Sequence, residues 1–532
     1  MVETKYIFVT GGVVPSLEKG IISSSLAHLL LSCGYRVTIQ KLDTQLNIDS
    51  GTLSPYEYGE CYVTADGHEV DLKLGHYERF TGIETTRANN ITMGRIYQSV
   101  MNKERRGDYL GQKIQVIPHI TDEIKRVVKL LGSAGKYDFV ITEVEGVAGN
   151  IESLPIMEAI RQLKWELQQN CVCVHLNDVQ YHNEELDKEV VQQLCKELKV
   201  VQADMLVLRS EKEIPLEMRK EIAHLCNIEV DSVIQAINVP SIYEFPKILH
   251  EQHFEKIVLR KTGHSVAVEC DLTAWNRFLE YLHNATEKVK IGLVGVGVEF
   301  QDAYRSIRES LLYAAAYHDR NLDLYCISSD KMNDGNVENT LSGLDGVIIT
   351  PGHGPLGVEG QYTALKWCRE NDMPTFGIGL GMQSVVIEFV RNVLGLKAAN
   401  STEMDPKTPC NAIDLMEAQK IMSGVGGAMR LGNYRCVLQE GSMVANAYGT
   451  LAINGRHRHR YEINNDYRER LEEGGMKCVG VNPETNLVEV VEIPSKTWFV
   501  GTQYHPEYNN TVLQPNPLFM DFMRAVLKKR EN

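Results

Sequence analysis

The sequence lacks several features that would assign it to a special class of protein. No apolar run approaches the roughly 18 residues that a membrane-spanning helix needs. Residues 1–8 are charged before they become apolar, which is not the pattern of a signal peptide. Internal repeats and low-complexity tracts are also missing. We therefore expect a cytoplasmic, enzyme-like protein that makes no membrane contact.

The sequence also lacks paired cysteine motifs and an excess of positive charge. The 12 cysteines form no CxxC pair, and only Cys171 and Cys173 stand close together, on a predicted strand. This scatter predicts reduced cytosolic thiols rather than a disulfide framework or a zinc site. The 55 basic residues are outnumbered by 70 acidic ones, for a net charge of −15, which argues against a general nucleic-acid binder.

The chain has 532 residues, too many for one core, and its composition is that of a globular protein. An apolar run at residues 6–10 ends in two glycines and is followed by a helical pattern at 21–32 and a strand at 37–41. That order predicts a β-α-β unit at the start of a parallel, doubly wound sheet. Further buried strands are predicted at residues 114–117, 139–143, 172–176 and 205–208.

A second domain is predicted to begin near residue 289. Residues 271–288 read as a polar helix, and VKIGLVG at 289–295 opens a new apolar strand. We therefore predict an α/β protein with a domain at residues 1–270, a linker helix at 271–288 and a domain at 289–532.

The most informative motif is FGIGLGMQ at residues 376–383, which follows an apolar strand and precedes a helical run. This context predicts a tight strand-to-helix turn that lifts one side chain into a pocket, as in a nucleophile elbow. The residue at the apex is Gly379. Because glycine has no side chain, the turn carries no nucleophile.

A second glycine-rich turn, GGVVPSLEKG at residues 11–20, lies between the first strand and the first helix. This position suits a loop that cradles phosphates, with Lys19 reaching the terminal phosphates. The residue before the lysine is Glu18, however, where a phosphate-binding loop has glycine. The motif alone favours a glycine turn with a solvated lysine.

The chain as a whole resembles the CTP synthase family. In the first half the resemblance rests on residues 41–43, 47–49, 51–56, 75–80, 102–111, 115–120 and 151–155. In the second half it rests on residues 301–304, 400–403, 429–432, 456–462 and 503–507.

The resemblance implies a P-loop-like doubly wound synthetase domain followed by a class I glutamine amidotransferase domain with a flavodoxin-like α/β fold. In that family the first domain uses Mg²⁺ and ATP to phosphorylate the uracil 4-oxygen of UTP, and ammonia displaces the phosphate to give CTP. The second domain releases the ammonia from glutamine, and a tunnel carries it across. The positions that match nucleotide-binding residues are Ser16, Lys19, Gly20, Lys41, Asp43, Gln115, His119 and Arg209.

The glutaminase half departs from the family at its nucleophile. The family motif is G-I-C-L-G-M-Q, so Gly379 stands in place of the cysteine, while His505 and Glu507 match the base and carboxylate of the triad. The oxyanion loop P-G-G-F-G reads PGHGP at residues 351–355. Positions that match the family's glutamine pocket are Gly352, Gln383, Glu403 and Arg460. We expect no glutamine hydrolysis, although an amino acid could still bind.

The synthetase half departs at its phosphate and metal sites. Glu18 brings a negative charge to the triphosphate position. The family's D-L-D-L-G binds Mg²⁺ through its second aspartate, and here that position is Lys73, with Glu143 as the partner ligand. We hypothesise that Lys73 replaces the ion by pairing with Glu143 or Glu18. ATP and Mg²⁺ are therefore implied by the resemblance, and the residues argue against Mg²⁺.

The family's UTP segment, G-E-x-K-T-K-P-T-Q, is replaced by a shorter acidic stretch at residues 179–190. The leading hypothesis is a non-catalytic paralogue that forms homo-tetramers or filaments, or assembles with a true CTP synthase. A nucleotide-dependent ligase with an altered substrate, and a CTP synthase that uses free ammonia, remain as alternatives.

Overall fold

The computed structural model describes residues 3–12, 19–179, 181–182, 185–186, 188–415 and 429–531. It divides into two compact units, one of Met1–Ser50 with His76–Leu279 and one of Gly51–Gly75 with Glu280–Asn532. Residues 51–75 therefore pack with the C-terminal half, although their place in the sequence suggests the N-terminal half. Each unit is described by itself below.

The first unit is built on a seven-stranded sheet in the order β11-β10-β7-β1-β6-β2-β5. All its strand pairs are parallel. The strands are β1 (Lys5–Gly11), β2 (Val37–Asp43), β5 (Asn90–Thr92), β6 (Phe139–Val144), β7 (Cys171–Asp178), β10 (Met205–Ser210) and β11 (Val233–Ile237). Their nearly continuous burial explains the apolar runs of the sequence, because both faces of a parallel sheet are covered by helices.

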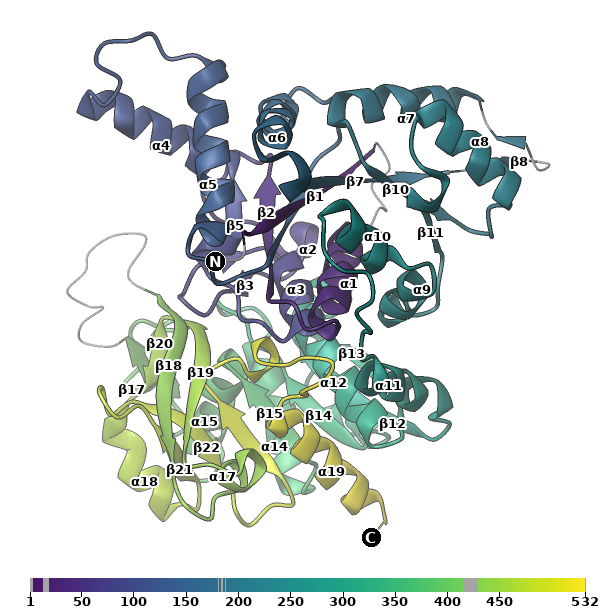
Figure 1. The fold of residues 1–532 in the computed structure, drawn as a ribbon. Coiled ribbons are helices and arrows are strands. Elements are labelled where there is room, and N and C mark those ends of the chain that lie inside the picture. Colours follow the sequence, from purple (N-terminus) through teal and green to yellow (C-terminus); the bar gives the residue numbers. More distant parts are fainter. Residues whose placement is uncertain are drawn as a thin grey trace. The chain divides into compact units, whose positions relative to one another are not determined.

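The helices of this unit are visible in Figure 1 around the sheet. They are α1 (Lys19–Ser32), α4 (Met93–Arg106), α5 (Thr121–Ser133), α6 (Leu154–Leu167), α7 (Lys188–Val201), α8 (Leu216–Cys226), α9 (Phe245–Glu251) and α10 (Phe254–Lys261). A small hairpin is formed by β8 (Tyr181–His182) and β9 (Glu185–Leu186). The helix α3 (Lys73–Thr81) begins in the second unit and ends in the first, and α11 (Thr273–Asn284) does the reverse.

One predicted strand is wrong. Residues 114–117 were expected as a buried strand, but the chain there enters a short helical segment, Val116–Ile120, that leads into α5. Val116 and Ile117 are about half exposed, at 48% and 53%. An apolar run of this length does not distinguish a strand from an exposed loop, because periodicity alone cannot report which residues the tertiary structure covers.

The second unit contains a nine-stranded sheet in the order β13-β12-β14-β15-β23-β22-β21-β18-β19. The first five strands are parallel and the rest antiparallel. The strands are β12 (Lys288–Gly295), β13 (Asn321–Ser328), β14 (Gly346–Ile349), β15 (Thr375–Ile378), β18 (Arg430–Leu438), β19 (Ala452–His459), β21 (Lys477–Val481), β22 (Val488–Glu492) and β23 (Phe499–Thr502). Two hydrophobic clusters, which include Val385 on one side and Phe522 on the other, form its core.

The remaining elements of this unit surround the sheet. Its helices are α2 (Pro55–Tyr58), α12 (Arg305–Tyr317), α13 (Val337–Leu341), α14 (Val358–Glu370), α15 (Leu380–Asn392), α17 (Met443–Tyr448), α18 (Arg468–Glu473) and α19 (Pro517–Glu531). A small sheet is formed by β16 (Ala399–Ser401), β17 (Cys410–Leu415) and β20 (Tyr461–Ile463), and a hairpin by β3 (Tyr62–Val63) and β4 (Glu69–Val70). The predicted α/β fold class is confirmed for both units.

Segment 51–75 is held in the second unit by buried polar contacts. Arg456, which is fully buried, donates to the Tyr62 hydroxyl (3.0 Å) and to the Val63 carbonyl (3.1 Å). Both oxygens of Glu60 accept from the Ser306 N–H at 3.0 Å, at the first turn of α12. These contacts join residues nearly 250 or more positions apart, so no local sequence pattern reports them.

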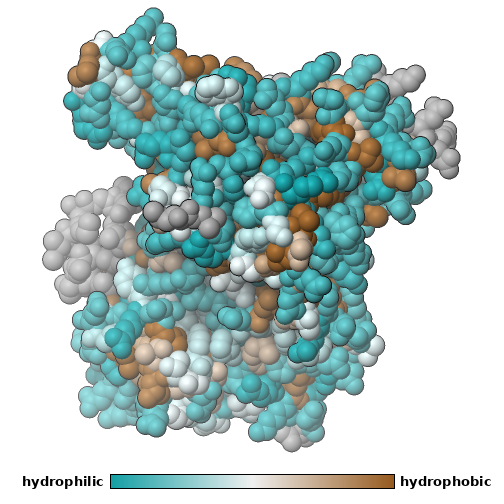
Figure 2. Space-filling view, in the orientation of Figure 1, coloured by the Kyte–Doolittle hydropathy of each residue, from teal (hydrophilic) through white to brown (hydrophobic). Residues whose placement is uncertain are grey.

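The cysteine prediction is wrong at one pair. Cys33 and Cys270, 237 residues apart, form a disulfide, whereas all thiols were expected to be free. No helix within the described residues combines the length and the apolar character that crossing a bilayer requires. On the face drawn in Figure 2, hydrophilic residues predominate and patches of apolar residues interrupt them.

Candidate functional site

The predicted turn at Gly379 is present between β15 and α15. Gly379 has φ +56° and ψ −112°, and its N–H donates to the Thr502 carbonyl at 2.8 Å. A Cβ placed on Gly379 would lie 3.4 Å from His505 Nε2 and 3.3 Å from the Pro351 Cβ. A side chain at this position would therefore point at the imidazole, which is the geometry of a nucleophile and its base.

The base and its orienting carboxylate are both in place. His505 Nδ1 lies 2.8 Å from Glu507 Oε1, and the side chains are 5% and 2% exposed. The Tyr508 ring stacks on the imidazole, with ring centroids 5.0 Å apart and an interplanar angle of 11°. This packing fixes the orientation of His505 and directs Nε2 towards the turn. The pair is thus arranged to activate a nucleophile that residue 379 does not supply.

A cavity of about 280 Å³ opens beside this turn. It is lined by Gly379, His505 and all four residues predicted for the glutamine pocket: Gly352, Gln383, Glu403 and Arg460. Gln383 Nε2 donates to the Tyr461 carbonyl at 3.0 Å, and Glu403 Oε1 accepts from the Gly354 N–H at 2.9 Å. The structure therefore brings these predicted residues together, and their role in binding an amino acid stays a prediction.

A larger neighbouring cavity, of about 510 Å³, shares His353 and His505 with the first. One wall is formed by segment 51–61, including Tyr56, Glu60 and Cys61. Burial raises the pKa of the Cys61 thiol to about 12, so this cysteine is protonated and unreactive at neutral pH. Sequence reasoning missed this wall, and only the tertiary structure assigns residues 51–61 to it.

A buried polar cluster lies behind the smaller cavity. Arg430 pairs with Glu462 (3.2 Å) and with Glu489, and His457 Nδ1 lies 2.8 Å from His459 Nε2. Burial raises the pKa of Glu462 to about 8, against the opposing effect of Arg430. Burial lowers the pKa of both histidines well below the usual value, so His459 faces the cavity as a neutral imidazole. Glu489 is a member of this cluster that sequence reasoning missed.

In the first unit, four predicted residues gather at the carboxyl ends of β1, β2 and β6. Lys41 Nζ lies 2.5 Å from Asp43 Oδ2. Lys41 is paired in register with Glu143 of the neighbouring strand. Lys19, at the first turn of α1, is buried and donates to the Gly146 carbonyl at 2.7 Å. The carboxyl edge of a parallel sheet is where such folds bind ligands, because helix N-termini and loops converge there.

Glu143 occupies the position predicted for a metal ligand. It is fully buried, its Oε2 accepts from the Tyr77 hydroxyl, and a Cβ placed on Gly20 would lie 3.1 Å from that oxygen. The second ligand position is Lys73, whose N–H donates to Asp71 Oδ1 at 2.9 Å. Glu143 offers Mg²⁺ a carboxylate oxygen, but the ammonium of Lys73 offers no oxygen donor, so the second predicted ligand position does not suit this ion. The pairing of Lys73 stays a prediction, and Ser16 and Glu18 lie outside the described residues.

The other predicted nucleotide-site residues lie on separate elements of the first unit. The Gln115 N–H donates to His119 Nδ1 at 3.1 Å, and the His119 ring meets the Tyr109 ring edge-on with centroids 4.9 Å apart. Arg209, near the end of β10, lies over the Phe245 ring at 5.1 Å. Their role in binding a nucleotide stays a prediction.

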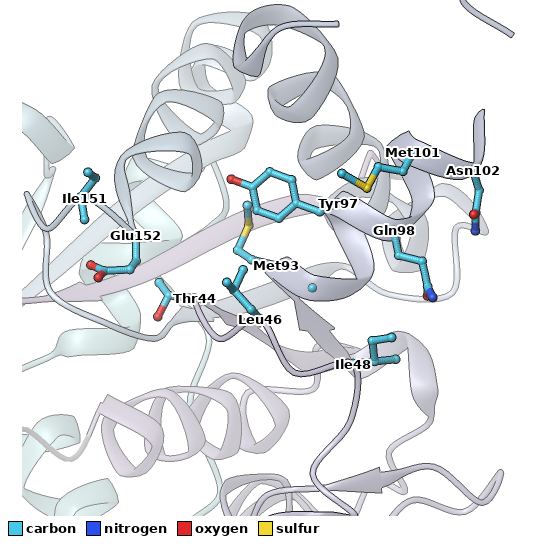
Figure 3. A pocket seen from close by; sticks show the side chains of 11 residues that line it. Thr44, Leu46, Ile48, Met93, Tyr97, Gln98, Met101, Asn102, Ile151 and Glu152 are labelled. Atoms are coloured by element: carbon cyan, nitrogen blue, oxygen red, sulfur yellow. The ribbon is translucent and has the colours of Figure 1, made fainter. Parts of the chain in front are cut away.

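A broad apolar hollow of about 690 Å³ also lies in the first unit. Figure 3 shows Met93 and Tyr97 of α4 near Thr44 and Leu46, which follow β2. Several of its side chains are largely exposed, including Leu46 (71%), Met101 (66%) and, at the other end, Ile151 (79%). Sequence reasoning did not identify this surface, because its parts come from three separate segments.

Comparison with known proteins agrees with both halves of this description. The model of the CTP synthase N-terminus matches residues 5–263, and that of class I glutamine amidotransferases matches residues 299–525. The CTP synthase of Porphyromonas gingivalis (strain ATCC 33277) is 56% identical over 100% of this chain and 99% of its own length. The chain belongs to the CTP synthase family.

A second full-length relative agrees. The CTP synthase of Bacteroides fragilis (strain ATCC 25285) is 57% identical over 99% of this chain and all of its own length. Among solved structures, the glutaminase domain of Trypanosoma brucei CTPS with bound acivicin is 32% identical, covering 45% of this chain and 94% of that one, with a TM-score of 0.43. The two family models, at residues 5–263 and 299–525, confirm the predicted family and the predicted order, a synthetase domain and then an amidotransferase domain.

Proposed function

We propose that this chain is a CTP synthase-family protein that does not hydrolyse glutamine and that acts in a regulatory or assembly role beside an authentic CTP synthase. The observation that carries the proposal is the geometry at Gly379. The turn, the base His505 and the carboxylate Glu507 form the frame of a cysteine-dependent glutaminase. The thiol that must attack the amide carbon is missing, and no other residue takes its place at the apex of the turn.

His505 does not compensate for the missing thiol. An imidazole paired with Glu507 can take a proton from a water molecule, but water attack forgoes the covalent intermediate that divides the difficult step into two easier ones. At the oxyanion loop, His353 replaces a glycine of the family motif, so the loop carries a ring where the family has only backbone donors. We therefore expect no turnover of glutamine.

The synthetase half supports a second candidate function. Lys19, Lys41, Asp43 and Glu143 lie at the carboxyl edge of the parallel sheet. The two relatives that match over their full length share more than half of their residues with this chain, and both are named CTP synthases. A CTP synthase that uses free ammonia would need this half alone. Against it stand Lys73 at a magnesium-ligand position and the loss of the family's UTP segment, which leave the non-catalytic role as the better proposal.

The decisive experiment separates the two reactions in the unmodified protein. Glutamate release from glutamine tests the second unit, and CTP and ADP formation from UTP, ATP, Mg²⁺ and ammonium chloride tests the first. We expect neither product. Glutamate release above that of a His505→Ala variant would overturn the glutaminase part, and ammonia-dependent CTP would establish the second candidate. ADP without CTP would indicate an altered acceptor.

A parallel variant restores the synthetase positions. Glu18→Gly with Lys73→Asp returns the family residues at the phosphate and metal positions, and Lys73→Asp alone and Glu18→Gly alone are the matched controls. Ammonia-dependent CTP formation in the double variant, with none in the unmodified chain, would trace the loss of activity to these two charges. If none of the four proteins forms CTP, the loss of the UTP segment at residues 179–190 would be the remaining explanation.

The assembly role requires a surface for another subunit. The apolar hollow beside α4 offers one, because large exposed apolar patches mark interaction sites. We propose that this surface joins copies of the chain in a homo-tetramer or filament, or joins it to an authentic CTP synthase in the cytoplasm. Co-expression of the tagged chain with the P. gingivalis enzyme tests the mixed form. Recovery of the two proteins as separate oligomers would exclude it.

A further inference from the structure

Four potential metal ligands converge in the first unit, and none of them belongs to the candidate sites described above. They are Cys33, just after the end of α1, His250 on α9, Glu255 on α10 and Cys270 in the segment after α10. Figure 1 shows α1, α9 and α10 side by side. The Asp271 N–H donates to the Ser32 carbonyl at 3.1 Å, which holds the second cysteine segment against the end of α1.

The ligand atoms are already close to one another. His250 Nδ1 lies 3.0 Å from Glu255 Oε1, and the Cys270 sulfur lies 4.0 Å from the same oxygen. These three atoms all lie within 4.8 Å of one another, and the Cys33 sulfur is bonded to that of Cys270. Zn²⁺ binds sulfur at about 2.3 Å and nitrogen or oxygen at about 2.0–2.2 Å, so its tetrahedral ligands lie roughly 3.3–3.8 Å apart.

A buried carboxylate gives the second reason to expect a ligand. Glu255 is fully buried, and its Oε2 has no hydrogen-bond partner among the described residues. A buried carboxylate that is only partly satisfied is costly, since nothing replaces the water that the second oxygen has lost. A divalent cation between the sulfurs, the imidazole and this carboxylate would satisfy it. His250 is 32% exposed, so the site also has a path from solvent.

We propose that the reduced protein binds one Zn²⁺ through Cys33, His250, Glu255 and Cys270, and that the disulfide is the metal-free, oxidised form of the same site. Reduction by a dithiol transfers two electrons and two protons to the two sulfurs, and the dithiol leaves as its own disulfide. Zn²⁺ then replaces the two thiol protons, which pass to solvent, and four sulfur, nitrogen and oxygen ligands close the coordination shell.

The metal would tie the end of α1 to α9 and α10, whereas the disulfide joins the end of α1 to the segment after α10. Since α1 begins at Lys19 on the carboxyl edge of the sheet, the metal would anchor the far end of the helix that leads from the glycine-rich turn. A site with four protein ligands has no open position for a substrate, so its role is structural rather than catalytic. This inference does not depend on the proposed function.

The test is metal binding by the full chain. Reduced under anaerobic conditions, freed of reductant and titrated with Co²⁺ or Zn²⁺, the protein should bind one ion per chain, with the absorption of a tetrahedral cobalt thiolate. Cys33→Ser and Cys270→Ser should each weaken Zn²⁺ binding by more than about 100-fold, beyond the 10–100-fold effect of losing a residue that only orients a ligand. His250→Ala and Glu255→Gln should weaken it as well.

A matched control is available in the same unit. The sulfurs of Cys195 and Cys226 lie 3.7 Å apart, so Cys195→Ser removes an equally close thiol outside the cluster and should leave Zn²⁺ binding unchanged. No uptake by the reduced protein, or uptake that survives Cys270→Ser, would overturn the proposal.

A measurement on the unmodified protein covers the case in which the variants do not fold. Zn²⁺ should slow alkylation of Cys33 and Cys270 in the reduced chain, read by peptide mass, and leave Cys195 and Cys226 unaffected. Equal alkylation of all four with and without Zn²⁺ would also refute the site.

Discussion

Replacing Gly379 by cysteine tests the geometry of the turn between β15 and α15. The backbone at this turn has φ +56° and ψ −112°, a region that costs a residue with a side chain about 1–3 kcal/mol. For a unit of this size each kcal/mol lowers Tm by about 2–4 °C, so Gly379→Cys should melt about 2–12 °C below the unmodified protein. Steric room is adequate, since the nearest atoms to the new Cβ are 3.3–3.5 Å away.

The new thiol should be reactive. Its Cβ would lie 3.4 Å from His505 Nε2, and an adjacent imidazole lowers a thiol pKa from about 8.5 into a range of roughly 3.5–7.5. The rate of alkylation by iodoacetamide, followed against pH at residue 379 by peptide mass, should therefore titrate below neutrality. The reference is the same thiol in a variant that lacks the imidazole of His505.

Two matched variants separate backbone from chemistry. Gly379→Ala has the same backbone strain but no thiol. Its Tm should therefore equal that of Gly379→Cys, and residue 379 should not react with iodoacetamide. Adding His505→Ala to Gly379→Cys should move the titration of the thiol to higher pH. If the thiol at residue 379 titrates alike with and without His505, the turn does not direct its side chain at the imidazole and the reasoning fails.

Three further predictions concern stability and assembly. Burial raises the folded-state pKa of Glu462 to about 8, above the unfolded value of about 4.5, so its contribution to stability should fall as pH rises between these values. The Tm difference between the unmodified protein and Glu462→Gln should shrink or reverse from pH 5 to 8, and a constant difference would contradict this. Arg456→Met should lower the free energy of unfolding by about 2–5 kcal/mol, because the Tyr62 hydroxyl and the Val63 carbonyl each lose a buried hydrogen bond. Thermal unfolding and proteolysis within residues 51–75 would measure it, and an unchanged Tm would refute it. Met101→Glu places a charge in the apolar hollow and should dissociate oligomers, which light scattering would record as a lower molar mass. Leu225→Glu on α8 should leave the molar mass unchanged, and equal effects of the two changes would exclude this surface.

Much of the fold could be predicted from local patterns. The strands at residues 139–143, 172–176 and 205–208 were expected because parallel strands covered on both faces must be continuously apolar, and the structure contains them as β6, β7 and β10. The prediction at 114–117 failed, because three apolar residues around Gln115 in an exposed connection look like part of a buried strand. Burial is a property of the folded chain, and a short run does not reveal it.

The candidate site divides in the same way. The strand-turn-helix context of residues 376–383 identified Gly379, and the family motifs added His505 and Glu507. The wall at residues 51–61, the buried Glu489 and the apolar hollow beside α4 were missed. Each is assembled from segments far apart in the chain, and each depends on which surfaces pack together.

The sequence by itself determined that residue 379 carries no thiol, because a side chain missing from the sequence is missing in any fold. It also determined the α/β class and the family, through local periodicity and dense motifs. Only the tertiary structure decided that residues 51–75 belong to the second compact unit, and that Cys33 and Cys270 lie close to His250 and Glu255. The physical reason is the distance along the chain over which each effect acts. Backbone preferences depend on a few neighbouring residues, whereas tertiary packing depends on the burial of surfaces from segments far apart in the sequence.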